Sequence, residues 1–292
     1  MMQDVGGVDP LAVGLPRAED AWAKINLTLH VTGQRPDGYH LLDSLVVRAK
    51  VGDRLQVTPA EDLTLSVDGP FAEGVPLDAR NLAIRAAELL DAGTGRGAAL
   101  RLTKNLPAAA GIGGGSADAA ATLRALGAHW GLPLPQDTAT LGADVPVCLQ
   151  DGPQRMTGVG EVLTPVGPLP PCWIVLVNPG RPLATPQVFA ELECKLNAPM
   201  EAIPAFANFA KFATWLASQR NDLEASARAI LPEISLCLEA LKDAALARMS
   251  GSGATCFGLY ESAAQARAAA HCIAKVQPGW WVAAAPMISS DG

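Results

Sequence analysis

A glycine-rich loop that leads directly into a helix is the feature that most constrains this chain. Residues 107–118 read PAAAGIGGGSAD, with four glycines among the five residues 111–115. Glycine allows the backbone positive φ angles and close approach to a ligand. Residues 116–130 then have a helical pattern, which Gly131 and Pro133 end. Because the first N–H groups of a helix lack internal partners and its dipole is positive there, the loop indicates a phosphate-binding site.

Two common phosphate loops do not match this one. A Walker A loop ends in Gly-Lys-Ser/Thr, whereas Gly115 is followed by Ser116 and Ala117. A dinucleotide fingerprint needs a third glycine at the position of Ser116. A flexible glycine linker is the remaining alternative. It is disfavoured because Pro107 and a strong helix flank the loop, rather than polar filler.

Length and charge narrow the class of protein. A chain of 292 residues is long for one hydrophobic core, so two domains are expected. Apolar residues make up 49% and charged residues 17%, as in globular proteins. The net charge of -7 argues against nucleic acid or an anionic membrane as the main partner. A small anionic substrate remains compatible, since a pocket can be locally positive.

The cysteines and the N-terminal residues point to the cytoplasm. None of the six cysteines forms a C-x-x-C pair, and the four histidines form no H-E-x-x-H pair, so no zinc or redox motif is present. Scattered thiols are typical of a reducing compartment. Residues 1–20 lack a signal-peptide pattern and are expected to form a flexible leader. No uncharged apolar run reaches about 18 residues, so no membrane span is expected.

Hydrophobic periodicity predicts a mixture of strands and helices. In residues 21–32 apolar and polar residues alternate, which predicts a strand with one buried side and with Lys24, Asn26, Thr28 and His30 on the other. The other expected strands cover residues 45–57, 62–68, 98–103, 173–177, 255–260 and 281–288. The expected helices cover residues 81–92, 116–130, 186–193, 205–219, 222–242 and 262–275.

This order of elements favours an α+β fold in which helices pack against a largely antiparallel sheet. The stretch PVGPLPP at residues 165–171 is a plausible domain boundary.

The glycine loop also carries a family resemblance. PAAAGIGGGSADAAA resembles the P-x-x-x-G-[LI]-G-G/S-S motif of the galactokinase, homoserine kinase, mevalonate kinase and phosphomevalonate kinase superfamily, the GHMP kinases. The resemblance rests on four motifs in the expected order, from about residue 21 to about residue 288. It implies an ATP-dependent small-molecule kinase with a two-domain α+β fold. Residues 21–165 would form an ATP-binding and catalytic domain with a mostly antiparallel sheet and helices, and residues 166–292 a ferredoxin-like α/β domain.

Two motifs supply the catalytic pair that the resemblance implies. In A-K-I-N-L, Lys24 would be catalytic and Asn26 would position the substrate. In L-G-A-D-V-P-V, Asp144 would be catalytic. A carboxylate beside the acceptor hydroxyl can take its proton during phosphoryl transfer, and a nearby lysine would keep that carboxylate ionised. The alternatives are an exposed strand lysine and an aspartate that caps a turn or helix.

The resemblance also assigns the nucleotide site. The ATP-binding residues would be Pro107, Ala108, Ala109, Ala110, Gly111, Ile112, Gly113, Gly114, Gly115, Ser116 and Ala117. Mg²⁺ is expected to arrive with ATP, because it binds mostly through phosphate oxygens, and no protein metal ligand is assigned. A third glycine motif, residues 249–254, resembles the superfamily's C-terminal loop near the phosphates, with an ordinary turn as the alternative.

The run G-Q-R-P-D-G-Y-H at residues 33–40 marks the branch of the superfamily whose small-molecule substrate carries cytidine diphosphate. By resemblance Tyr39 and His40 hold the cytosine, and Phe189 in the run T-P-Q-V-F stacks on its far side. Aromatic rings can stack on a base and a histidine can bond its edge. Ordinary packing of these rings is the alternative. The resemblance further implies a monomer or weak homodimer without nucleic acid or membrane partners.

The sequence departs from the family pattern twice. Ala117 stands where many relatives have a second serine, and the segment 132–140 is short enough that a helix there is expected to be trimmed or missing. Three other readings fit less well. A mevalonate or sugar kinase of the superfamily would lack G-Y-H, a non-catalytic nucleotide sensor would lack Lys24 or Asp144, and a redox enzyme would need the dinucleotide spacing.

Overall fold

A computed structural model describes residues 15–289, which form two compact units. The first unit contains the described residues up to Ala21 together with Gly52–Leu106 and Gly115–Leu149. The second contains Trp22–Val51, Pro107–Gly114 and the described residues from Gln150 onward. We expected one boundary near residue 165. The units are instead interleaved, because the long strand β3 and the segments around the glycine loop carry the chain from one to the other.

The first described strand begins earlier than expected. Strand β1 spans Arg17–Asn26, so the described part of the expected leader includes four strand residues, 17–20. Residues 1–14, the rest of that expected leader, lie outside the described residues.

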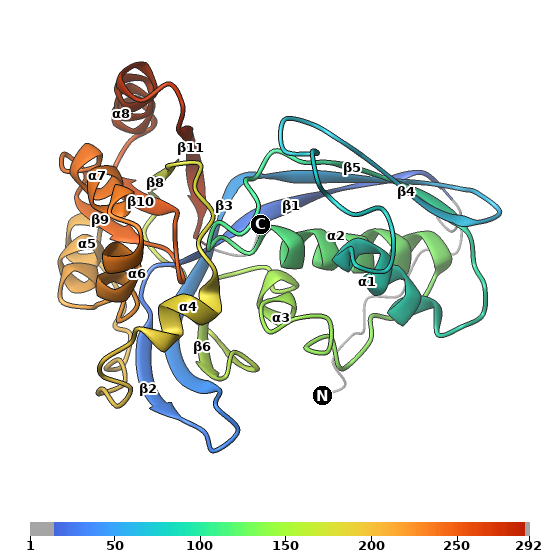
Figure 1. The fold of residues 1–292 in the computed structure, drawn as a ribbon, viewed down its shortest axis with the longest axis horizontal. Coiled ribbons are helices and arrows are strands. Elements are labelled where there is room, and N and C mark those ends of the chain that lie inside the picture. The colour runs from blue at the N-terminus through green and yellow to red at the C-terminus, as the bar shows by residue number, and fades with distance from the viewer. Residues whose placement is uncertain (1–14, 290–292) are drawn as a thin grey trace. The chain divides into compact units, whose positions relative to one another are not determined.

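The first unit packs helices on a small sheet. Strand β5 (Ala98–Thr103) pairs in parallel with β4 (Leu63–Asp68) and antiparallel with the last residues of β3 (His40–Thr58). Helices α1 (Leu82–Asp91), α2 (Gly114–Trp130) and α3 (Val145–Cys148) lie below β4 and β5 in Figure 1. The largest fully buried side chains of this core include Leu55, Leu100, Leu102, Leu106, Leu123 and Leu126.

The second unit holds an antiparallel four-strand arrangement. Strand β8 (Trp173–Asn178) lies between β10 (Cys256–Tyr260) and β11 (Trp281–Ile288), and β9 (Leu246–Met249) pairs with β10. Helices α7 (Glu233–Ala240) and α8 (Ala263–Val276) pack against these strands. The other helices of this unit are α4 (Thr185–Ala190), α5 (Phe209–Ala217) and α6 (Glu224–Ile230).

The first part of β3 extends this unit. It pairs with β2 (His30–Gln34), with β6 (Gln154–Gly158) and, at Ala49, with the end of β11. Strand β7 (Val162–Pro165) completes a hairpin with β6. The strands and helices together confirm the expected α+β class.

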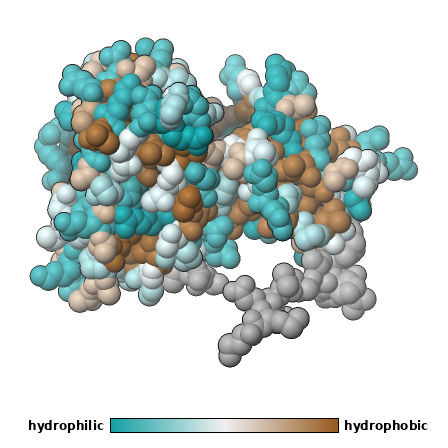
Figure 2. All heavy atoms as spheres, turned by 90° about the horizontal axis from the view of Figure 1, so that it is seen from below, coloured by the Kyte–Doolittle hydropathy of each residue, from teal (hydrophilic) through white to brown (hydrophobic). Residues whose placement is uncertain are grey.

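Within residues 15–289 no helix is long and apolar enough to cross a membrane. Figure 2 shows hydrophobic residues in small groups among hydrophilic ones on the face it draws. The exposed large hydrophobic side chains, such as Leu77, Leu196 and Val276, come from separate segments of the chain.

Candidate active site

The end of strand β1 carries two of the expected site residues in the second unit. The Nζ of Lys24 donates a hydrogen bond to the Oδ1 of Asn26 at 2.8 Å, and the Nδ2 of Asn26 donates to the Oγ of Ser44 at 2.8 Å. Both residues are buried: Lys24 is only 4% exposed and Asn26 only 1%. The prediction of a strand with one buried side is therefore wrong, since its polar face is also covered. Internal hydrogen bonds make that burial tolerable.

The glycine loop joins this strand end within the same unit. The backbone N–H of Lys24 donates to the carbonyl of Ile112 at 2.9 Å. The Oγ of Ser250 donates to the carbonyl of Gly111 at 3.1 Å and accepts from the backbone N–H of Asn26 at 3.1 Å. Three of the motifs therefore meet at one place: the strand with Lys24, the glycine loop, and the loop with Ser250. The first and the last lie more than 200 residues apart in the sequence.

The backbone of the loop requires glycine at particular positions. Gly111 has φ +73°, and a Cβ there would stand 2.6 Å from the carbonyl oxygens of Ser250 and Gly253. Gly113 also has a positive φ, of 65°. Ala109 adopts φ 49° without being a glycine, which stores backbone strain of the kind found at functional sites. These backbone angles, together with the hydrogen bonds from Lys24 and Ser250, favour a defined turn over a flexible linker.

A second glycine turn lines the same loop, and an asparagine that the sequence did not reveal fixes it. The Nδ2 of Asn221 donates to the carbonyls of Met249 and Gly251 at 2.8 and 2.9 Å. The hydroxyls of Thr185 and Ser252 are 2.7 Å apart and share a hydrogen bond. The pattern N-D-L-E around Asn221 predicts only a helix start, so it gave no sign of these contacts.

The expected base-binding residues are partly brought together. The rings of His40 and Phe189 are stacked, with centroids 4.6 Å apart and planes at 23°. Tyr39 beside them is 64% exposed. The Nε2 of His40 is buried and makes no hydrogen bond to the described residues. Burial, and then the ammonium of Lys195, lower the pKa of His40, so its imidazole is neutral at neutral pH.

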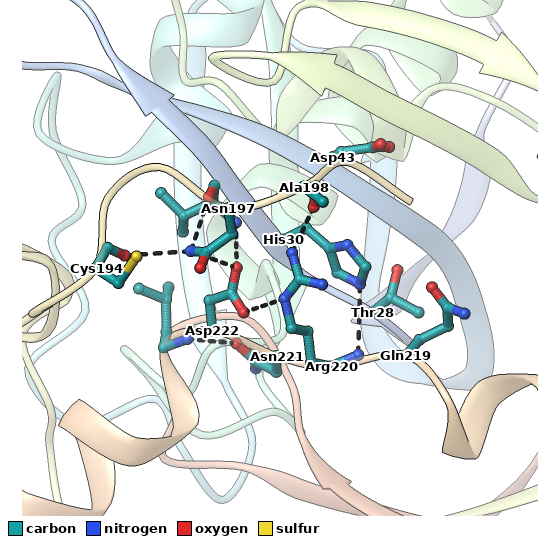
Figure 3. A network of polar contacts seen from close by, with 12 residues as sticks. Thr28, His30, Asp43, Cys194, Asn197, Ala198, Gln219, Arg220, Asn221 and Asp222 are labelled. Atoms are coloured by element: carbon teal, nitrogen blue, oxygen red, sulfur yellow. Dashed lines mark hydrogen bonds and ion pairs between the residues drawn. The ribbon is translucent and has the colours of Figure 1, made fainter. Parts of the chain in front are cut away.

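The segment that carries Lys195 is anchored by a polar network, drawn in Figure 3. The Nδ2 of Asn197 donates to the carbonyl of Val31 and to the Oδ2 of Asp222, at 3.1 and 3.2 Å. Asp222 also accepts from the backbone N–H of Val31 at 2.7 Å and from the Nε of Arg220 at 2.6 Å. Arg220 in turn donates to the carbonyl of Ala198 at 2.5 Å. These bonds hold the segment against strand β2.

The remaining expected residues belong to the first unit. Asp144 stands at the N-cap position of α3, but its side chain makes no capping hydrogen bond to that helix. The alternative of an aspartate that caps this helix is therefore not supported, while a role in a turn is not tested. Ser116 and Ala117 lie in the first turn of α2, with Ala117 buried. Residues 131–144 contain turns and no helix, as the short segment predicted.

Family models match both parts of the chain. The model described as "GHMP kinases N terminal domain" matches residues 81–154, and "GHMP kinases C terminal" matches residues 200–278.

Individual relatives cover nearly the whole chain. The 4-diphosphocytidyl-2-C-methyl-D-erythritol kinase of Cereibacter sphaeroides (strain ATCC 17025 / ATH 2.4.3) is 55% identical over 91% of this chain and 98% of its own length. The kinase of that name from Dinoroseobacter shibae is 57% identical over 92% and 94%. A crystal structure of 4-(cytidine 5'-diphospho)-2C-methyl-D-erythritol kinase matches with a TM-score of 0.75 and 33% identity, covering 94% of this chain and 100% of that one. The chain therefore belongs to the 4-diphosphocytidyl-2-C-methyl-D-erythritol kinase family of the GHMP kinases.

Proposed function

We propose that this protein transfers the γ-phosphate of ATP to the 2-hydroxyl of 4-diphosphocytidyl-2-C-methyl-D-erythritol, in the non-mevalonate route to isoprenoid precursors. The observation that carries the proposal is the meeting of Lys24–Asn26, the glycine loop and the Ser250 turn through direct hydrogen bonds. The relatives named for this kinase supply the identity of the acceptor.

The glycine loop and the first turn of α2 would hold the phosphates of ATP. Positive φ at Gly113 comes without a side chain that would hinder a phosphate, whereas Gly111, also at positive φ, lets the loop pack against the carbonyls of Ser250 and Gly253. The helix N-terminus favours negative charge. Magnesium, when bound with ATP, neutralises part of the phosphate charge. Residues 15–289 contain no cluster of three or more metal-ligating side chains. Mg²⁺ commonly binds mainly through phosphate oxygens, so ATP itself would supply most of its ligands.

Asp144 would act as the base. Its carboxylate accepts the proton of the 2-hydroxyl as the hydroxyl oxygen bonds to the γ-phosphorus and the bond to the ADP oxygen breaks. Lys24 would offset the negative charge of the transferring phosphoryl group through its ammonium. The hydrogen bond to Asn26 gives this ammonium a fixed direction before the substrate arrives.

The cytidine would be recognised by Tyr39, His40 and Phe189. Neutral His40 can offer one donor and one acceptor to the edge of a base. Its buried Nε2 lacks a partner among the described residues, which costs about 1–3 kcal/mol, and a bound base that supplies the partner would recover this cost. Because His40 covers one face of Phe189, we propose that the base enters by displacing the His40 ring.

A coupled assay of ATP consumption with a panel of acceptors tests the function directly. We expect turnover with 4-diphosphocytidyl-2-C-methyl-D-erythritol and none with mevalonate, galactose or free methylerythritol phosphate. Equal turnover of free methylerythritol phosphate would show that the cytidine is not recognised. Turnover of mevalonate or galactose instead would assign a different acceptor within the superfamily.

Replacing Tyr39 by alanine should raise KM for the cytidylyl substrate about tenfold, because stacking on a base contributes roughly 1–3 kcal/mol. The Kd for ATP alone should stay unchanged. Tyr39→Phe is the matched control, since it keeps the ring and should keep near-native kinetics. Steady-state assays and calorimetry measure both quantities. A native KM in Tyr39→Ala would remove Tyr39 from the cytidine site.

Replacing Lys24 by alanine should lower kcat by roughly 10²-fold, the usual loss when one charge-stabilising donor is removed. Lys50→Ala is the control, because Lys50 is an exposed lysine on strand β3 of the same unit. Circular dichroism would verify that both variants fold. A rise in KM for ATP at unchanged kcat would reassign Lys24 to phosphate binding alone.

We further propose that the enzyme works in the cytoplasm as a monomer or weak homodimer, without nucleic acid or membrane partners. Light scattering over a range of protein concentrations checks the assembly.

A further inference from the structure

A buried cluster of three charges lies in the first unit, outside the residues discussed so far. The Nζ of Lys104 donates to the Oδ2 of Asp118 at 2.6 Å and makes a second short ion pair with the Oδ2 of Asp53. Lys104, Asp53 and Asp118 are only 6%, 1% and 3% exposed. Lys104 follows strand β5, Asp53 belongs to β3 and Asp118 lies in the first turns of α2.

The cluster joins the two ends of the glycine loop. On the incoming side, the Oδ1 of Asp53 accepts from the backbone N–H groups of Asn105 and Leu106 at 2.5 and 2.8 Å. On the outgoing side, Asp118 is tied to the same Asp53 carboxylate through Lys104. The chain leaves the first unit at Leu106 and re-enters it at Gly115, so these contacts fix both stems of the loop.

We propose that Lys104, Asp53 and Asp118 form a stem clamp that positions the glycine loop for ATP. The three are positioning residues, since the glycine loop and not the clamp would contact the nucleotide. The inference rests on the proposed function, because it takes the loop to be the phosphate site.

The charges of the stem clamp argue for a role beyond stability. Two carboxylates share one ammonium, and the Oδ1 of Asp118 is buried without a hydrogen-bond partner among the described residues. Buried ion clusters are a poor way to stabilise a fold, since hydrophobic replacements are often neutral or stabilising. A buried charge cluster that does not favour stability is expected where function requires it.

The stem clamp also affects the charge near the N-terminus of α2. An unpaired carboxylate in the first turns of a helix would occupy the positive end of its dipole and repel a phosphate. The described hydrogen bonds of the Asp118 carboxylate go to Lys104 and not to the helix N–H groups. Lys104 thus neutralises a charge that would otherwise compete with ATP for the helix end.

The pKa shifts of the cluster reflect its burial. Burial raises the pKa of Asp118 above its ordinary value, against the attraction of Lys104 and with support from Asp53. Burial alone would lower the pKa of Lys104, but the two carboxylates, Asp118 first, raise it. Lys104 therefore stays cationic, while the folded protein holds the Asp118 proton to a higher pH than the unfolded chain does.

A calorimetric titration with ATP tests the clamp in two aspartate variants. Asp118→Asn keeps the shape and removes the ion pair, so Kd for ATP should rise about tenfold, the loss expected for one bond to a charged group. Asp91→Asn is the matched control. Asp91 is a 9% exposed aspartate of the same unit whose carboxylate accepts from the N–H groups of Gly95 and Arg96 after α1. Its Kd should stay native, even though its thermal stability falls.

A double variant tests Lys104 in a protein that should still fold. Lys104→Met alone leaves two buried carboxylates without their ammonium and is expected to unfold the protein. Lys104→Met/Asp118→Asn restores the net charge of the cluster, and its Kd for ATP should be no better than that of Asp118→Asn. Native affinity in this folded double variant, or an Asp118→Asn protein that loses stability but binds ATP within twofold of native, would overturn the clamp.

The pH dependence of unfolding supplies a second readout. The folded protein binds more protons than the unfolded chain between the ordinary and the raised pKa of Asp118, so stability falls as pH rises through that window. Asp118→Asn should flatten this fall in Tm, measured from about pH 5 to about pH 8. A slope identical to that of the native protein would contradict the charge assignment of the clamp.

Gly113→Val, titrated in parallel, separates the clamp from the proposed function. If Gly113→Val loses ATP and Asp118→Asn behaves like Asp91→Asn, only the clamp is overturned. If Gly113→Val binds ATP normally, the loop is not the phosphate site and the clamp is overturned with it.

Discussion

Replacing Asp144 by asparagine is expected to lower kcat by roughly 10²–10⁴-fold, the usual contribution of a positioned base. Asparagine keeps the shape of the side chain but cannot accept the proton of the acceptor hydroxyl. KM for ATP and for the cytidylyl substrate should change little, because the lost interaction forms only in the transition state. The variant should remain folded, because asparagine has nearly the same size as aspartate and can still take part in hydrogen bonds, and circular dichroism checks this.

Asp137→Asn is the control for this variant. Asp137 is an exposed aspartate of the same connecting segment, and only its backbone carbonyl takes part in a described side-chain bond, from Thr140. Its kcat should remain within about twofold of native, as for most surface substitutions. Steady-state kinetics with saturating ATP compare the two variants. A folded Asp144→Asn protein with near-native turnover would remove Asp144 from the mechanism.

The secondary structure was predictable wherever the chain gave strong local signals. Helix α1 was expected at residues 81–92 and spans Leu82–Asp91, with Asn81 capping it through a bond from the N–H of Ala83. Strand β5 was expected at residues 98–103 and is found there. In both cases the periodic pattern and the flanking turn residues agree, so local and tertiary preferences coincide.

The misses have physical causes. The helix expected over residues 222–242 is two helices, because Pro232 removes a backbone N–H donor and stands between α6 and α7. Strands β6 and β7 were not predicted. They form a hairpin of only five and four residues, which is too short for a clear periodic pattern. Strand β9 has only four residues, too few for periodicity to reveal.

The site was predictable in its motifs but not in its supporting contacts. The strand Lys24–Asn26 and the glycine loop could be named from short patterns in the sequence. The loop of their shared partner Ser250 could be placed near the phosphates only by family resemblance. Its bonds to Asn26 and Gly111 could not be predicted, because they span 224 and 139 residues. Buried polar contacts at such separations depend on tertiary folding, which no local pattern encodes.

Replacing Gly113 by valine is expected to abolish detectable ATP binding while leaving the chain folded. Gly113 has φ 65°, a conformation that a β-branched residue adopts only under strain, and the new side chain would also block close approach of a phosphate. The strain should cost on the order of 1–3 kcal/mol, which a domain of ordinary stability can tolerate. Calorimetry with ATP and thermal unfolding measure the two effects separately.

Gly111→Ala is the variant to compare with Gly113→Val, because it should lower thermal stability more than it lowers affinity for ATP. The added Cβ would stand 2.6 Å from the backbone carbonyls of Ser250 and Gly253, so the turn formed by residues 250–253 must move to admit it. Since that turn also bonds Asn26 and Asn221, its displacement should lower Tm of Gly111→Ala well below that of Gly113→Val. If the loop binds phosphate, the two variants should differ: Gly113→Val should lose affinity for ATP, and Gly111→Ala should lose packing against the turn. Unchanged ATP affinity in a folded Gly113→Val protein would instead make the loop a purely structural joint between strand β1 and the Ser250 turn.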